Sequence, residues 1–146
     1  MGRGKGGYTE KLPSYKDSGG QKVTDRNTIF VAECYMDLGF EVVFRRRHDP
    51  ERGCDLTIKT SNDEDIVKNI EVKGITSANP SKISSRIADA AGQIKEGDTI
   101  AIYLPKHRNN QAGRSFAETG IQEAQRKGLI KGPIEVWFAD KTCLHY

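Results

Sequence analysis

The residues best suited to chemistry are an aspartate in one short apolar segment and a Glu-x-Lys pair in the next. If these segments are neighbouring strands, Glu71 and Lys73 project from the same face, and Asp55 lies beside Glu71. Two carboxylates at that distance can hold a divalent cation through hard oxygen ligands, and a lysine beside them can orient or help to deprotonate a water. Phosphodiester hydrolysis needs these parts, together with positive charge facing the developing negative charge.

A third carboxylate, Glu33, occurs in a helical segment close to its apolar stripe, where a charge is costly unless something binds it. We therefore expect Glu33, Asp55 and Glu71 to be the metal ligands. Two alternatives remain open. An ion pair with Arg26 would explain Glu33, and a solvated strand face would explain the Glu-x-Lys pair, which occurs by chance about once in a chain this rich in both residues.

Basic residues predict a path for phosphates. The second expected helix carries Lys82, Arg86 and Gln93 on a face next to its apolar one. A run of arginines, Arg45, Arg46 and Arg47, follows the first expected strand, and Lys106 and Arg108 form a second basic spot. Such groups can grip a nucleic-acid backbone. The alternative at each place is an ordinary solvated loop or helix face.

The elements that would position these residues follow from periodicity and from turn signals. Residues 1–22 are rich in Gly, Lys and Arg and are expected to be a flexible lead, with the domain spanning 23–146. Thr24 or Asp25 can cap a helix to 38, which Gly39 ends. The other expected elements are strands 40–44, 54–58 and 66–72, helix 81–96, strand 99–104, helix 115–127 and strand 134–138. The expected fold class is α/β, with helices flanking a mixed sheet.

Length and composition limit the number of domains and the classes of function that the chain can have. The chain has 146 residues, 36% of them hydrophobic, and a net charge of +3. This length suits one domain with a core of its own, and the mild positive charge permits nucleic-acid binding without requiring it. No run approaches the roughly 20 apolar residues of a membrane span, so no span is expected.

Over about residues 24–104, the order of elements and acidic residues resembles the PD-(D/E)XK nuclease superfamily, whose restriction-endonuclease-like core runs α-β-β-β-α-β. The resemblance implies a divalent metal cofactor, Mg²⁺ first, with Mn²⁺ or Zn²⁺ as alternatives. It carries Glu33, Asp55, Glu71 and Lys73 over to the catalytic positions, and Gln93 from subgroups with a glutamine on that helix. One departure is Cys54, which stands where many members have proline.

The C-terminal helix and strand, together with the glycine-rich lead, are similar to the C-terminal toxin domains of contact-dependent growth inhibition proteins. That resemblance implies delivery at the end of a larger exoprotein and cleavage of tRNA in the cytoplasm of a target bacterium. It also implies a cognate immunity protein, expected to be acidic and to pair with Arg86, Lys82 or the arginines 45–47. A translation factor of the target cell is a further candidate partner.

Rival functions stay open at this point. The same catalytic residues could act on DNA, in a toxin or a resolvase-like enzyme, because the metal chemistry does not depend on the sugar. A non-catalytic nucleic-acid-binding domain would keep the fold, but the complete set of Asp55, Glu71 and Lys73 argues against it. Metal-free RNA cleavage by His48, His107 and His145 is the remaining alternative, and these residues share no sequence pattern.

Overall fold

In the computed structural model, the described part of the chain comprises residues 14–46, 54–61 and 65–146. Its elements, in chain order, are α1 (Arg26–Asp37), β2 (Glu41–Phe44), β3 (Leu56–Lys59), β4 (Ile66–Gly74), α2 (Ser81–Ala91), β5 (Thr99–Leu104), α3 (Gln111–Arg126), β6 (Ile134–Phe138) and β7 (Cys143–His145). The expected α/β class and order are confirmed, and β7 is an additional strand at the end. Within these residues, no helix is long and apolar enough to cross a membrane.

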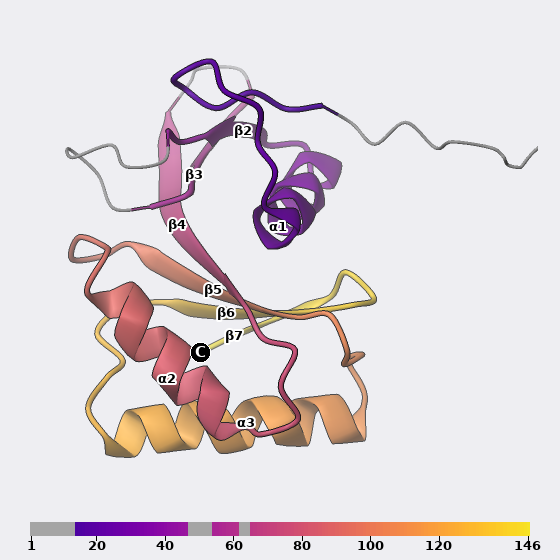
Figure 1. The fold of residues 1–146 in the computed structure, drawn as a ribbon, viewed down its shortest axis with the longest axis vertical. Helices are drawn as coiled ribbons and strands as arrows, with labels where there is room; N and C mark the ends of the chain where they lie inside the picture. Colours follow the sequence, from indigo (N-terminus) through magenta and orange to yellow (C-terminus); the bar gives the residue numbers. More distant parts are fainter. Residues whose placement is uncertain (1–13, 47–53, 62–64) are drawn as a thin grey trace, which may run out of the picture.

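The strands form one mixed sheet in the order β2-β3-β4-β5-β6-β7. The first three strands pair antiparallel, β4, β5 and β6 run parallel, and β7 returns antiparallel to β6. Helix α1 lies on one side of the sheet, and α2 and α3 lie together on the other (Figure 1). The long strand β4 therefore joins the antiparallel half to the parallel half.

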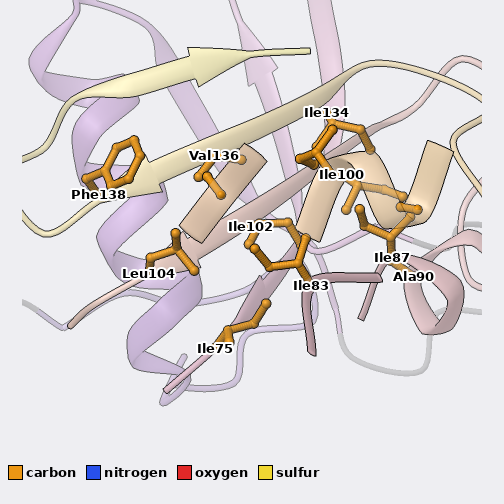
Figure 2. Packing of buried hydrophobic residues seen from close by; sticks show 13 residues of the cluster. Ile75, Ile83, Ile87, Ala90, Ile100, Ile102, Leu104, Ile134, Val136 and Phe138 are labelled. Carbon is orange, nitrogen blue, oxygen red and sulfur yellow. The ribbon is translucent and has the colours of Figure 1, made fainter. Parts of the chain in front are cut away.

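Alternation along the parallel strands builds the larger core. Every second residue of β5 and β6 points toward α2 and α3. From α2, Ile83, Ile87 and Ala90 meet them at helical spacing, as the apolar face of this helix predicted (Figure 2). Burial of these aliphatic side chains fixes α2 against the sheet and so fixes where its C-terminal end lies.

The opposite face of the sheet packs against α1. Asp25 caps this helix, because its carboxylate accepts hydrogen bonds from the backbone N–H groups of Asn27 (2.9 Å) and Thr28 (3.3 Å). At the other end Gly39 has a φ of 95°, which glycine adopts without strain. Both the predicted cap and the predicted stop of this helix are confirmed.

Two helix boundaries differ from prediction. Helix α2 ends at Ala91, not near 96, because Gly92 follows it as the C-terminal cap and the chain turns there. Helix α3 begins at Gln111, not 115, because the Asn110 side chain accepts a hydrogen bond from the N–H of Gly113 at 2.9 Å. The first change matters for the site, since it moves Gln93 from a helix into a turn.

The predicted boundary between lead and domain is also wrong in part. Residues 14–22, expected to be flexible, pack on the domain. The ring centroids of Tyr15 and Phe44 lie 4.9 Å apart, and Tyr15 packs against the core cluster beneath α1. The remainder of the predicted lead, residues 1–13, lies outside the described residues.

Candidate active site

A cleft of about 670 Å³ opens beside the N-terminal end of β3, where β4 extends past β3 while still pairing with β5 on its other edge. Its lining comes from residues 17–28 of the N-terminal segment and α1, from the ends of β2 and β4, from the start of β3, and from the turn after α2. Asp55, Glu71, Lys73 and Gln93 all lie in this lining. The structure thus brings together four of the five predicted catalytic residues, which come from three separate parts of the chain.

The position of Asp55 follows from the way the β3–β4 ladder ends. The last regular pair is Leu56 with Ile70, and the N–H of Asp55 still donates to the carbonyl of Ile70 at 2.9 Å. Beyond that point, the backbone N–H of Val72 donates to Asp55 Oδ2 at 2.9 Å. The carboxylate therefore takes the place of a strand partner, which fixes it beside Glu71.

Glu71 and Lys73 project into the cleft, whereas Ile70 and Val72 lie in the core beneath α1, as strand alternation predicted. Lys73 Nζ lies 3.4 Å from Glu71 Oε2. The hairpin register therefore confirms the spatial arrangement that was expected from the Glu-x-Lys spacing and from Asp55.

Glu71 is only 6% exposed, an unusual environment for a carboxylate. Burial, followed by the neighbouring Asp55 carboxylate, raises the pKa of Glu71 to about 8, although the Lys73 ammonium acts in the opposite direction. Near neutral pH the two carboxyls therefore share a proton, which belongs to the pair. A divalent cation between the two carboxyls would replace this proton. The pair therefore fits such a cation.

The other predicted metal ligand, Glu33, does not join the pair. Its Oε2 accepts a hydrogen bond from the Tyr15 hydroxyl at 2.8 Å, and it does not line the cleft. On a helix, residue 33 lies about 140° around the axis from Thr28, which does line the cleft. The described residues hold no group of three or more His, Cys, Asp or Glu side chains placed to bind a metal. Tyr15, and not the alternative Arg26, is the partner of Glu33.

The predicted basic residues divide into two sets. Arg45 and Arg46 line the cleft, and Arg47 lies outside the described residues. Lys82 lies at the far end of α2, in a separate hollow between α2 and α3, and Arg86 pairs with Asp89 at 3.3 Å. A single basic face joining the arginines to α2 is therefore not formed.

Two further predicted sets lie elsewhere. Lys106 and Arg108 are exposed in the loop between β5 and α3 and do not line the cleft. His107 stacks on Phe116 with ring centroids 4.1 Å apart, and His145 lies on edge strand β7. His48 is outside the described residues. The histidines that the structure describes are therefore not gathered at the cleft.

The cleft also contains residues that the sequence analysis missed. Lys22 and Gln21 line it from the segment interpreted as a lead. Asp17 and the glycines that follow it are a turn signal, which could have indicated an ordered hairpin.

Comparison with known proteins adds no relative. No family model, curated protein or solved structure matches the chain. The chemistry of the cleft is defined by its own groups: a carboxyl pair able to hold a hard cation, a lysine against that pair, and arginines on one wall.

Proposed function

We propose that this protein is a metal-dependent nuclease that hydrolyses phosphodiester bonds. The observation that carries the proposal is the Asp55–Glu71 carboxyl pair in an open cleft, with Lys73 Nζ 3.4 Å from Glu71. Two adjacent carboxyls in a buried position are unfavourable when both are charged, and a bound cation would offset that cost. Open access suits a polymeric substrate better than an enclosed pocket would.

Each residue has a role that follows from its position. Asp55 and Glu71 would hold the cation, and Val72 keeps Asp55 in place through its backbone N–H. When bound, a divalent cation there supplies a Lewis acid for the phosphate and lowers the pKa of a water. The Lys73 ammonium faces the negative charge that develops on the phosphate and can orient the attacking water. Gln93 presents an amide to the same space from the turn after α2.

The proposal is tested by incubating the purified full chain with total RNA and with plasmid DNA. With Mg²⁺ we expect cleavage that EDTA abolishes and that added Mg²⁺ or Mn²⁺ restores. Cleavage that survives EDTA unchanged would contradict the metal mechanism. Absence of cleavage of both nucleic acids with either metal would contradict the nuclease itself.

As substrate we propose RNA, and tRNA in particular, in the cytoplasm of a target bacterium. This choice is supported by the resemblance of the C-terminal half to contact-dependent toxin domains, which also implies a larger exoprotein carrier. DNA is the alternative substrate, and the cleavage assays with total RNA and with plasmid DNA distinguish the two.

A toxin of this kind requires an immunity protein in its producer. An acidic partner covering the cleft would meet Arg45 and Arg46, and complementary charge would make its capture fast and specific. Induced expression of the chain in bacteria should stop growth, and co-expression of the immunity protein should restore it. Normal growth with Asp55, Glu71 and Lys73 intact would contradict the toxin role, but it would not contradict nuclease activity in vitro.

A further inference from the structure

One wall of the cleft is a small hairpin formed by residues 15–23, which we call the N-terminal hairpin. Lys16 and Lys22 pair across it, and the N–H of Val23 donates to the carbonyl of Tyr15 at 2.9 Å. At its turn, Asp17 Oδ1 accepts hydrogen bonds from the backbone N–H groups of Gly19 (2.8 Å) and Gln21 (3.0 Å). The turn is therefore closed by its own side chain and has a defined shape.

The hairpin is attached to the domain at several points. The Ser18 N–H donates to the carbonyl of Phe44 at 2.8 Å, and the N–H of Arg46 donates to Ser18 Oγ at 2.8 Å. The Tyr15 hydroxyl donates to Glu33. These bonds hold the hairpin on the end of β2, so that Arg46 and the hairpin form one continuous wall.

Gly19 allows this close approach. A Cβ on Gly19 would lie 2.5 Å from Cδ of Arg46, which is closer than two non-bonded carbon atoms approach. The absence of a side chain there lets the stem of Arg46 lie along the hairpin. A side chain at position 19 would therefore require the Arg46 side chain, which also lines the cleft, to move.

The charges on this wall are available for a ligand. Lys22 and Arg46 line the cleft, and neither forms an ion pair with any residue that the structure describes. The nearby acids are engaged elsewhere: Asp17 accepts from the turn, and Asp25 caps α1. Lys22 and Arg46 therefore add two positive charges to the cleft lining, while the Asp17 and Asp25 carboxylates in the same lining accept hydrogen bonds from backbone N–H groups.

We propose that the N-terminal hairpin is a substrate-binding element, in which Lys22 binds a backbone phosphate next to the reacting one and Gly19 positions Arg46 for another. The ligand class is a single nucleic-acid strand, whose successive phosphates can each be bound by a cation of the cleft lining. This inference rests on the proposed nuclease function for its biological meaning, but it concerns binding and can be measured without cleavage.

The test uses the full chain and a fluorescein-labelled single-stranded RNA of about 20 nucleotides, in EDTA, with anisotropy recorded over a series of salt concentrations. Lys22→Ala should raise Kd about 3- to 10-fold and reduce the slope of log Kd against log salt by about 0.7. Lys16→Ala is the matched control, because it removes the same charge from the same hairpin outside the cleft lining. Gly19→Ala should also weaken binding of the RNA. It should have no further effect in an Arg46→Ala variant, because Gly19 is proposed to act through the position of the Arg46 side chain.

The possible outcomes distinguish a failure of the hairpin proposal from a failure of the nuclease proposal. Equal Kd and equal salt slope for Lys22→Ala and Lys16→Ala would overturn the hairpin proposal, as would a wild-type chain that fails to bind the RNA. If Lys22→Ala weakens binding but wild type cleaves no nucleic acid, the hairpin proposal stands and the nuclease proposal fails. If wild type cleaves, Lys22→Ala should raise KM and leave kcat nearly unchanged, which a merely structural role would not do.

Discussion

Replacing Lys73 by alanine should lower the rate of phosphodiester cleavage about 100- to 1000-fold while the protein remains folded. Lys73 Nζ lies 3.4 Å from Glu71 Oε2 of the carboxyl pair, and one-fifth of the lysine side chain (21%) is exposed. Its truncation therefore removes a charge from the reaction site and little packing from the core. The loss should appear in kcat, since the charge acts on negative charge that develops in the transition state.

The measurement is a single-turnover cleavage rate at saturating Mg²⁺, recorded together with thermal unfolding. Saturating metal is needed because the Lys73 ammonium changes both the pKa of Glu71 and the charge of the site, so its removal also changes the metal affinity. Lys131→Ala serves as the control, because Lys131 is exposed and does not line the cleft. A wild-type rate in folded Lys73→Ala protein would show that the lysine has no catalytic role.

The second large effect is expected on stability, at a buried polar cluster that does not line the cleft. Glu135 on β6 is 1% exposed, and its Oε2 lies 2.7 Å from Lys68 Nζ. Its other oxygen accepts a hydrogen bond from Trp137 Nε1 at 2.9 Å, and the Tyr35 hydroxyl also donates to Glu135. Burial and the Glu135 carboxylate hold the pKa of Tyr35 far above its usual range, so its hydroxyl remains a donor.

Lys68→Ala should therefore destabilise the protein by about 3 kcal/mol, because it leaves a buried carboxylate without its cation. We place the effect at the lower end for broken buried pairs, since Lys68 is 27% exposed and two neutral donors remain. Chemical denaturation measures the change. Lys68→Ala combined with Glu135→Gln should recover most of the lost stability. An equal loss of stability in the double variant would show that lost packing, and not the unpaired carboxylate, causes the effect.

Much of the fold could be predicted because its signals are local. Asp25 and Gly39 mark the ends of α1 by themselves, and the Asp55–Glu71 pairing follows from a hairpin of consecutive strands. Strand alternation then decides which side chains enter the cleft. The candidate site was predictable to the extent that it depends on neighbouring strands and on side-chain period.

The remaining features depend on contacts between distant segments. Glu33 could not be placed from sequence, because its partner Tyr15 belongs to a segment that composition alone describes as a lead. Lys68 and Glu135 are 67 positions apart, and no local pattern links them. Lys82 and Arg86 share a helix face with suitable spacing, but the end of α2 that reaches the cleft is the other one.

The most direct test of the central claim is a calorimetric titration of the metal-free full chain with Mn²⁺. We predict one binding site that Asp55→Asn abolishes. Because the raised pKa of Glu71, about 8, leaves a proton on the pair at neutral pH, cation binding should release about one proton. The affinity should therefore rise about tenfold per pH unit as pH approaches 8 from below, and then level off. Equal Mn²⁺ affinity in wild type and in folded Asp55→Asn, or binding that does not depend on pH over this range, would contradict a metal site at Asp55 and Glu71.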